Sequence, residues 1–436
     1  MAMGVRIESV PGMSDIMPEE AALWQWVETR CRDVLRRYGF GEIRTPIVER
    51  TELFLRTTGE GSEVVQKQMF TFADRSGRSL ALRPEGTPSV MRALLEHQAD
   101  AAISRVFYVG PMFRSERPQA GRRRQFHQLG AEAIGTESAA ADAEMIALTY
   151  DLCAAVGLED ARVVVNSIGT AADQGAIRTL LAGHFAAAAE RLCAECRRRL
   201  EGNVLRILDC KNAGCQTAIE AAPALESAIA PESREHFARV LALLAAAGVP
   251  YQCENRLVRG LDYYSRTVWE VRHPALGAQD ALGGGGRYDR LAASLGDRAD
   301  RPGVGFAMGL ERMLLAIQAA APAPAGAAPP LVWVVSAGEA AVPANFCLLH
   351  RLRREGLAAA GEFERPSLRA QMRLANRAGA PWVMIRGDAE LAQGLVCLKE
   401  MAGGRQWLLA EDEAIEQVKK GVAAGDSPPP ATGSGR

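Results

Sequence analysis

The sequence predicts a protein of three parts: a large domain of mixed strands and helices, a helical segment inserted into it, and a smaller α/β domain. Three observations predict this fold class. Strand-like apolar runs and amphipathic helices share residues 18–165 and 255–313. Residues 170–250 are rich in Ala, Leu and Arg with helical periodicity, and residues 331–420 alternate strand and helix patterns. With 436 residues, 48% apolar and 24% charged, the chain can form more than one core and is not disordered throughout, collagen-like or a coiled coil.

The first element is a helix over 18–38, because Pro18 and two glutamates mark a helix start and apolar residues follow at helical spacing. Short strands are predicted next, at 42–48, 69–72 and 80–82. Two longer strands, at 105–109 and 126–132, flank an arginine-rich turn. A helix over 138–156 and a strand over 162–165 then lead into the helical segment.

The large domain resumes with a strand over 267–271 and ends in a helix near 308–318. The Ala- and Pro-rich run 319–330 predicts a linker, and the large domain is assigned residues 1–325. Beyond it, strands at 331–335, 382–385 and 395–399 and helices at 343–355 and 367–378 predict a compact α/β domain over 331–420. The tail, 421–436, has too little apolar content to fold, so we expect it to be disordered.

The charges nearly balance, 51 basic against 52 acidic residues, so any contact with nucleic acid must come from a local basic patch. The longest uncharged run, 316–338, contains four prolines and is not a membrane span. The N-terminus lacks a signal-peptide pattern. We therefore expect a cytoplasmic protein without a membrane partner, whose nine cysteines are reduced thiols.

The arginine-rich turn lies in FRSERPQAGRRRQFHQLGAE, residues 113–132, which holds five arginines between Arg114 and Arg124. Arginine presents a planar set of donors that suits phosphate oxygens. A solvated hairpin tip is the alternative interpretation. Strand alternation favours a site, because it places Phe126, Gln128 and Glu132 on one face. His127 falls on the opposite face and is expected to be structural.

Three further motifs have the composition of binding sites, although each alone can be a turn or a surface loop. The turn ALRPEGTPS, 81–89, can direct a carboxylate and a hydroxyl at an ammonium group. The segment NRLVRGLDYYSRTVWE, 255–270, crowds arginines and tyrosines together. The glycine-rich runs GGGGRYDRL and PGVGFAMGLERM, 283–291 and 302–313, allow close backbone approach but match neither a P-loop nor a dinucleotide-binding motif.

Four cysteines stand close together in the helical segment, and their spacing is compatible with a zinc site. Cys193 and Cys196 have the two-residue spacing of zinc ligands, whereas Cys210 and Cys215 are separated by four residues, at the edge of the usual range. Four reduced cysteines packed in or near helices are the interpretation that we prefer at this point.

Taken in order, these motifs resemble those of the histidyl-tRNA synthetases, class II aminoacyl-tRNA ligases, over residues 5–420. RTPIVE around Pro46 is similar to the first class II motif, 113–132 to the second, and 302–313 to the third. RGLDYYSRT and GGGGRYD are similar to two signatures of this family. The resemblance implies an α+β class II synthetase catalytic domain with an antiparallel sheet and flanking helices, a helical insertion over 170–250, and an α/β anticodon-binding domain.

The resemblance also implies the chemistry. Histidine and ATP would form histidyl-adenylate and pyrophosphate, and the histidyl group would pass to the 3′ end of tRNA-His. Arg114 and Arg259 would hold the α-phosphate as catalytic cations. Glu116, Phe126 and Arg312 would complete the ATP site, and Mg²⁺ would bridge the phosphates. Such phosphoryl chemistry depends mainly on positioning and positive charge.

The remaining implied residues bind histidine and tRNA. The histidine site would consist of Glu85, Gly86, Thr87, Gln128, Glu132, Tyr263 and Tyr264. In it, Glu85, Thr87 and Gln128 would bind the α-ammonium group, and Glu132 and Tyr264 the imidazole. The candidates for the acceptor end of tRNA are Gln119, Arg122 and Arg123. The first class II motif implies a homodimer.

One rival function uses the same fold: the catalytically inactive, synthetase-like regulatory subunit of ATP phosphoribosyltransferase, a histidine sensor. Its members tend to lose the arginine of RGLDYY and the C-terminal domain, both of which are present in this chain. A tRNA-binding chaperone or kinase-type sensor on this fold is a more distant alternative, since no extra domain is attached. The sequence therefore favours the ligase.

Overall fold

A computed structural model describes residues 7–59, 62, 64–97, 103–117, 121–261, 263–277, 279–297, 301–320, 331–362 and 367–423. The chain divides into two compact units, Met1–Ala323 and Pro324–Arg436, and each unit is described by itself.

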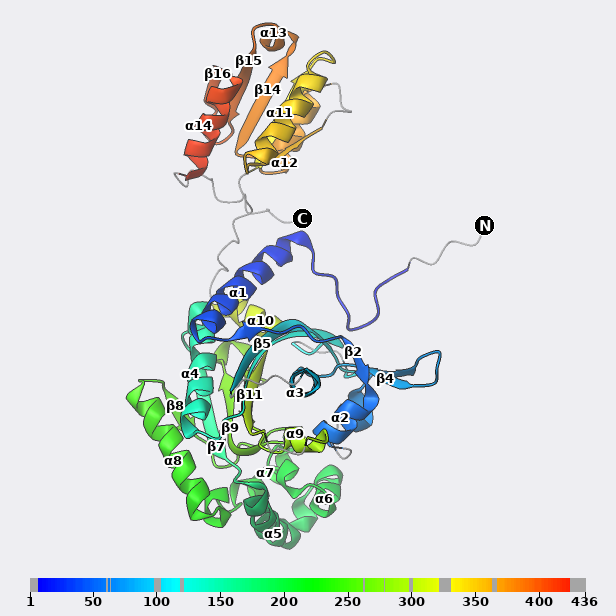
Figure 1. Ribbon diagram of the computed structural model, residues 1–436, viewed down its shortest axis with the longest axis vertical. Helices are drawn as coiled ribbons and strands as arrows, with labels where there is room; N and C mark the ends of the chain where they lie inside the picture. The colour runs from blue at the N-terminus through cyan, green and yellow to red at the C-terminus, as the bar shows by residue number, and fades with distance from the viewer. Residues whose placement is uncertain are drawn as a thin grey trace. The chain divides into compact units, whose positions relative to one another are not determined.

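An eight-stranded sheet forms the centre of the first unit (Figure 1). Its strand order is β1-β5-β6-β11-β10-β9-β7-β8, antiparallel except for the parallel edge pairs β1/β5 and β7/β8. The strands are β1 (Gly41–Glu42), β5 (Ser104–Phe113), β6 (Gln125–Ile134), β7 (Arg162–Ser167), β8 (Tyr251–Cys253), β9 (Ser265–Arg272), β10 (Ala281–Arg287) and β11 (Gly303–Gly309).

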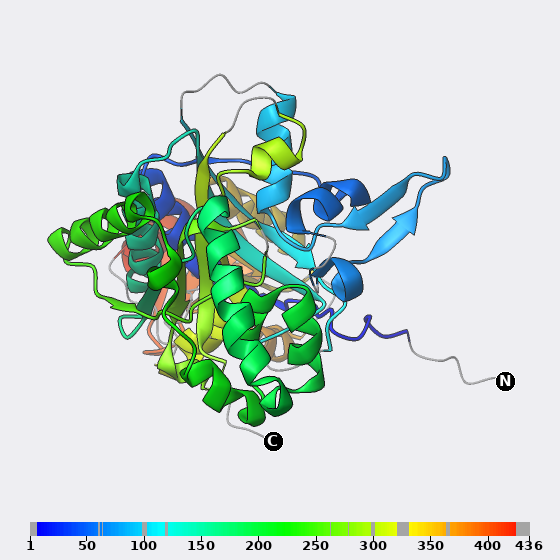
Figure 2. The same ribbon diagram turned by 90° about the horizontal axis from the view of Figure 1, so that it is seen from below.

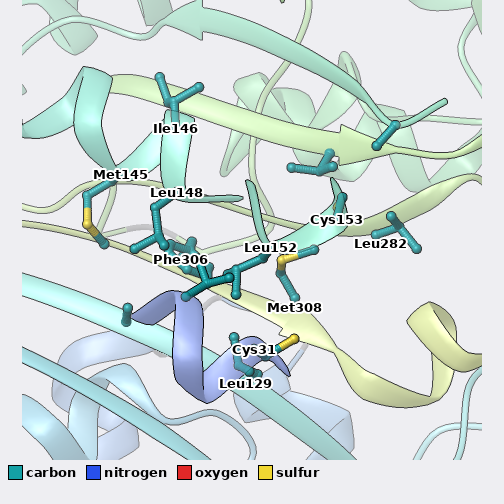
Figure 3. Packing of buried hydrophobic residues seen from close by; sticks show 14 of the residues in the cluster. Cys31, Leu129, Met145, Ile146, Leu148, Leu152, Cys153, Leu282, Phe306 and Met308 are labelled. Carbon is teal, nitrogen blue, oxygen red and sulfur yellow. The ribbon is translucent and has the colours of Figure 1, made fainter. Parts of the chain in front are cut away.

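Alternate residues of these strands face two different hydrophobic cores. On one face Leu129, Trp269 and Phe306 pack with four helices: α1 (Pro18–Arg37), α4 (Ala139–Ala155), α8 (Pro231–Ala246) and α10 (Leu310–Ala320). Figure 3 shows Cys31 of α1 beside Leu129, and apolar side chains of α4 near those of β11. This fully buried layer fixes the sheet from behind and leaves the other face for the site.

The opposite face packs against α3 (Thr87–Glu96) and the helical insertion. Tyr108, Val164 and Val268, which alternate with residues of the first core, belong to this second cluster. Of the predicted insertion, 170–250, three helices pack on this face: α5 (Ala171–Ala187), α6 (Ala194–Glu201) and α7 (Ala213–Glu220), with short 3₁₀ turns at Ala189–Arg191, Val204–Ile207 and Leu225–Ala228. These three helices lie together at one end of the unit (Figures 1 and 2). The last helix of the insertion, α8, packs on the other face of the sheet.

A small antiparallel sheet, β2-β4-β3, extends from this unit at its other side (Figure 2). The remaining elements of the unit are β2 (Val48–Arg50), α2 (Thr51–Thr58), a π-helical turn (Val64–Gln68), β3 (Thr71–Ala73), β4 (Ser79–Leu82), a 3₁₀ turn (Pro274–Leu276) and α9 (Leu291–Ser294).

The second unit is a five-stranded sheet with helices packed against it, in the order β13-β12-β14-β15-β16. Strands β13, β12 and β14 are parallel, and β15 and β16 continue antiparallel. The elements are β12 (Leu331–Ala337), α11 (Val342–Arg354), β13 (Ala358–Gly361), α12 (Leu368–Arg377), β14 (Trp382–Gly387), α13 (Asp388–Ala392), β15 (Leu395–Glu400), β16 (Gln406–Ala410) and α14 (Glu411–Ala423).

Three predictions from the sequence need correction. The strand predicted over 42–48 is wrong: Pro46 has no N–H to donate, and Arg83 binds the carbonyl oxygen of Thr45 at 2.9 Å, so only the two ends are strands. The tail is predicted over 421–436, but α14 includes residues 421–423, where Gly421 packs against Trp382. The linker is predicted over 319–330, but residues 319 and 320 belong to α10. The rest of that linker and of the tail lies outside the described residues.

Candidate active site

A cavity of about 510 Å³ lies on the insertion side of the large sheet. Residues of β5, β6, β9, β10 and β11 line it, together with the loop before β9 and the segment of the insertion between α6 and α7. It brings together most residues that the sequence predicts for the site: Glu85, Thr87, Arg114, Glu116, Arg122, Arg123, Phe126, Gln128, Arg259, Tyr263, Tyr264 and Arg312. Segments more than 200 residues apart in the chain thus form one cavity.

The alternation of β6 explains which of its side chains reach the cavity. Phe126 and Gln128 line it, whereas Leu129 lies in the core behind the sheet. His127 turns away as well: Glu311 accepts hydrogen bonds from its backbone N–H at 2.9 Å and contacts its Nδ1 at 3.1 Å. The Trp24 ring packs edge-on against His127, with 4.9 Å between the ring centroids. His127 therefore contributes to the structure and not to the cavity surface.

The carboxylate of Glu85 lies inside the cavity, where two hydroxyl groups donate hydrogen bonds to it. Thr58 Oγ1 donates to its carboxylate at 2.8 Å and Tyr263 OH donates at 2.9 Å. Burial raises the pKa of Glu85, while the charge of Arg114 and the two hydrogen bonds oppose the rise. The Tyr263 and Tyr264 rings stack at a tilt, 4.7 Å apart. The carboxylate and the two rings together form a pocket suited to a small cationic and aromatic ligand.

Glu132 is completely buried behind the cavity wall. Thr87 Oγ1 donates a hydrogen bond to its carboxylate at 2.6 Å, and Tyr288 OH donates a second. Burial raises the pKa of Glu132 to about 8; these two hydrogen bonds oppose the rise, and the negative charge of Glu85 adds to it. A ligand that reached Glu132 would meet a carboxyl group that is already oriented by two donors.

Two glycines make room for these buried groups. A Cβ at Gly305, on β11, would collide with the carboxylate of Glu132, and one at Gly86 would collide with the ring of Tyr108. Gly86 is among the residues predicted for the histidine site, and its described role is to let α3 start directly against Tyr108.

Arg259 enters the cavity from the loop before β9. Its Nη1 donates to Glu270 at 2.8 Å, and the other oxygen of Glu270 accepts from Arg272 at 2.7 Å. The Nε of Arg259 and the Oε1 of Gln128 are buried without a hydrogen-bond partner among the described residues. Because buried polar atoms are rarely left unpaired, both atoms are candidates to bind a ligand.

Two more arginines complete the positive wall. Arg114 Nε donates to the Pro84 carbonyl at 3.0 Å, and its guanidinium lies over the Phe126 ring, 5.3 Å from the centroid. Arg312 donates to the backbone carbonyls of Ala281 and Gln279. Burial lowers the pKa of Arg312, and the nearby charge of Arg122 lowers it further. Each guanidinium is therefore oriented by the backbone, with donors left over for a ligand.

The glycine run of β10 allows close approach, as the sequence predicts. The groups that approach it belong to the neighbouring strands and not to a ligand. Cβ atoms at residues 283–286 would collide with the backbones of β9 and β11. A Cβ at Gly284 would also lie 3.0 Å from Arg259 Nη1. Arg287, which follows the run, is fully buried and donates to Asp142 of α4 at 2.9 Å.

The candidates for the acceptor end of tRNA are only partly described. Arg122 and Arg123 line the cavity, and Arg122 contacts the carboxylate of Glu116 at 3.5 Å. Gln119 lies outside the described residues.

Several residues of the site were missed from the sequence. Tyr288 stands in GGGGRYD, and Glu270 ends the predicted tyrosine-rich motif, so both had a signal that was not used. Tyr108 had none, because it is an aromatic residue within an apolar strand. The insertion contributes Arg206, Leu208, Asp209 and Lys211 to the cavity wall, and no pattern in the sequence links them to it.

The cavity as a whole is more basic than acidic. Nine basic side chains line it against seven acidic ones, and Glu254 and Glu270 are already bound to Arg272. Fixed cations in a cavity favour a polyanion such as a polyphosphate, and they stabilise charge that develops during its reaction.

The four cysteines of the insertion also come together. Their sulfur atoms all lie within 4.8 Å of one another. Among the described residues, these four cysteines form the one group of three or more side chains placed to bind a metal ion together. None of the four lines the cavity. No described helix is long and apolar enough to cross a membrane.

Two family models match the chain, one in each unit. Residues 12–313 match the family described as histidyl-tRNA synthetase, and residues 331–421 match an anticodon binding domain.

Individual proteins agree with these models. The chain is 47% identical over 420 residues to a histidine–tRNA ligase of Synechococcus sp. (strain WH7803), covering 94% of this chain and 95% of that protein. It is 46% identical over 411 residues to one of Desulforudis audaxviator, covering 94% and 97%. The crystal structure of apo histidyl-tRNA synthetase from S. aureus superposes with a TM-score of 0.80 at 33% identity, over 95% of this chain and 100% of that one.

Proposed function

The chain belongs to the family of histidyl-tRNA synthetases and has their activity, the ATP-dependent ligation of histidine to tRNA-His, and we propose that the cavity on its large sheet is where it activates histidine. One observation carries this proposal: the cavity joins a pocket of carboxylate and tyrosine side chains to a wall of oriented arginines. The first part suits the amino acid, and the second suits the phosphates of ATP.

In this proposal, Arg114 and Arg259 bind the α-phosphate from two sides. The histidine carboxylate attacks that phosphorus, the bond to the β-phosphate oxygen breaks, and pyrophosphate leaves. Arg259 suits the role because Glu270 fixes one of its nitrogens, and its Nε has no partner among the described residues. Arg312 and Glu116 contact the rest of ATP, and Phe126 stacks on the adenine.

Histidine occupies the neighbouring pocket. Glu85 and Gln128 bind its α-ammonium group, with Thr87 beside them; the hydroxyl of Thr87 donates to Glu132, and its lone pairs can still accept. Gly86 supports the pocket indirectly, because it lets α3, which carries Thr87, begin against Tyr108. Glu132 and Tyr264 bind the two imidazole nitrogens, and Tyr263 orients Glu85. A pocket of such groups rejects apolar amino acids, because these would leave its polar groups unpaired.

Mg²⁺ fits this site as a companion of the nucleotide. Both oxygens of Glu270 accept from arginines and Glu116 contacts Arg122, so these two carboxylates already have protein partners. Mg²⁺ in such sites takes most of its non-water ligands from the phosphates, where it neutralises charge on ATP.

The product then reacts with tRNA. Arg122 and Arg123 at the cavity rim, with Gln119, are proposed to contact the acceptor end of tRNA-His, and the second unit is proposed to bind the anticodon. The cytoplasmic location that the sequence predicts suits a reaction that uses ATP and tRNA.

We also propose that the chain forms a homodimer through the region of RTPIVE. Ile47, Val48 and Phe72 are each more than 40% exposed on or beside the small sheet. Clustered exposed apolar side chains mark contact surfaces. Light scattering of the purified protein should give twice the mass of one chain. The substitution Val48→Glu should lower the measured mass toward that of a single chain. A wild-type protein of monomer mass at micromolar concentration would contradict the dimer.

The assay that tests the proposed activation site is exchange of labelled pyrophosphate into ATP. It needs no tRNA and so isolates the activation step. We expect exchange with histidine and not with other amino acids. Histidine binding without any exchange would contradict the proposed activation site and would favour the interpretation as a histidine sensor. Exchange with several amino acids would contradict the histidine pocket alone.

A further inference from the structure

The four cysteines of the insertion come from two short helices and the loop between them. Cys193 caps α6 and Cys196 lies in its first turn. Cys210 precedes α7, and Cys215 lies in the first turn of that helix. The Sγ atoms of Cys193 and Cys210 are 4.0 Å apart, and all four sulfurs lie within 4.8 Å of one another.

This separation has the size expected for a metal site. Zinc binds thiolate sulfur at about 2.3 Å, so four sulfurs at the corners of a tetrahedron lie about 3.8 Å apart. The sulfur of a disulfide partner would be only about 2 Å away. All four cysteines are free in the structure. Small shifts of these side chains would therefore suffice to surround one ion.

The surroundings of the sulfurs favour thiolates. The Cys193 backbone N–H donates to Cys215 Sγ at 3.2 Å, the Cys196 N–H to Cys193 Sγ at 3.5 Å, and the Asn212 N–H to Cys210 Sγ at 3.4 Å. The positive ends of two helices lie at the cluster, which also stabilises negative sulfur. Cys196 and Cys215 are fully buried, whereas Cys193 and Cys210 are partly exposed and leave a route for an ion.

We propose that Cys193, Cys196, Cys210 and Cys215 bind one structural zinc ion. The alternative, four reduced cysteines packed together, is the one that the spacing alone favoured. It gives no reason for four sulfurs to converge at helix starts with three backbone donors directed at them. All four positions would be filled by protein, so the ion would be structural rather than catalytic.

The zinc would close a loop whose far side forms part of the active-site wall; this consequence rests on the proposed function. Between the two cysteine pairs, Arg206 and Leu208 line the cavity. Arg206 donates to the carbonyl of Gly260, next to Arg259, and Arg199 donates to the carbonyl of Arg206 at 3.0 Å. An ion that fixes the ends of this loop thereby holds Arg206 against the segment that carries Arg259.

Elemental analysis of the full chain, purified without chelators, tests the site directly. We expect about one zinc per chain, and replacement by Co²⁺ should give the visible absorption of a tetrahedral thiolate complex. Cys210→Ser, at a partly exposed position, should lose at least half of the zinc, and Cys347→Ser, an exposed cysteine in the second unit, should lose none. Less than about 0.2 zinc per wild-type chain with nine titratable thiols, or a Cys193–Cys210 disulfide, would overturn the proposal.

Activity separates this proposal from the proposed function. Removal of zinc should lower histidine-dependent exchange and the unfolding temperature together, and added zinc should restore both. Arg259→Ala should keep its full zinc content, because its side chain pairs with Glu270 and supplies no ligand to the ion. Zinc without exchange in the wild type would overturn the proposed activation site alone. Exchange in a wild-type protein that purifies without zinc would overturn the zinc site alone.

Discussion

Arg259→Ala is expected to lower histidine-dependent pyrophosphate exchange by about 10³-fold, the effect of removing one oriented cation or donor from a developing phosphoryl charge. The side chain reaches the cavity with one nitrogen bound to Glu270 and with its Nε free of partners among the described residues. The arginine is therefore already oriented before ATP binds, and alanine removes both the charge and the orientation. Steady-state exchange at saturating ATP and histidine measures the loss.

Two variants distinguish catalysis from folding. Glu270→Gln keeps an acceptor for Arg259 Nη1 but removes its charge, so we expect a loss of only about tenfold. Arg239→Ala removes an exposed arginine of α8 that pairs with Glu235, and it should leave exchange unchanged. Thermal unfolding of Arg259→Ala should stay near that of the wild type. Exchange within about tenfold of the wild type in a folded Arg259→Ala protein would show that Arg259 does not act on the reacting phosphate.

Glu132→Gln is expected to weaken histidine binding by about 100-fold, because the carboxyl group can give up its proton to form a charge-assisted hydrogen bond with the imidazole and the amide cannot; such a bond contributes roughly 1.5–3 kcal/mol. The substitution keeps the size of the side chain. Thr87 can still donate to the amide oxygen, while the amide nitrogen, which replaces the second oxygen, can donate to the hydroxyl oxygen of Tyr288. ATP binding should change less than about threefold, since Glu132 lies apart from the arginines. Calorimetric titration with each ligand measures the two effects, and equal losses for both would contradict the assignment of Glu132 to the imidazole.

The same variant changes how stability depends on pH. Burial raises the pKa of Glu132 from 4.5 to about 8 in the folded protein. Between these values the folded chain holds a proton that the unfolded chain has released, so stability falls as pH rises through this window. Glu132→Gln should be less sensitive to pH from about 5 to 8 and more stable than the wild type near pH 8. Glu235→Gln, on the exposed face of α8, is the matched control.

The periodic elements were the most predictable part of the fold. The helix over 18–38 and the paired strands around the arginine-rich turn follow from periods of about 3.6 and 2 residues, and each ends within a few residues of the expected position, or extends further. Short elements were less predictable. Strands β13 and β16 were both missed. Strand β13 is made of Ala and Gly and owes its strand conformation to pairing with β12.

The site shows the same division. Arg114, Arg259, Tyr263 and Tyr264 stand in dense motifs whose composition alone marks them as candidates. Tyr108 and Arg206 carry no such mark, because each becomes part of the cavity only through the strand or insertion that brings it there. Thr58, which donates to Glu85, was missed for the same reason.

By itself the sequence determined the family, the arginines and tyrosines of the motifs, and the faces of the strands, because these depend on residue type and on local period. The tertiary structure alone decided which of these side chains meet. It buried Glu132 behind Thr87 and Tyr288, paired Arg259 with Glu270, and drew four cysteines with irregular spacing to within 4.8 Å of one another. The hydrogen bonds among these contacts join residues 11 to 156 positions apart, and such contacts are set by the packing of the whole sheet and its insertion, which no local pattern encodes.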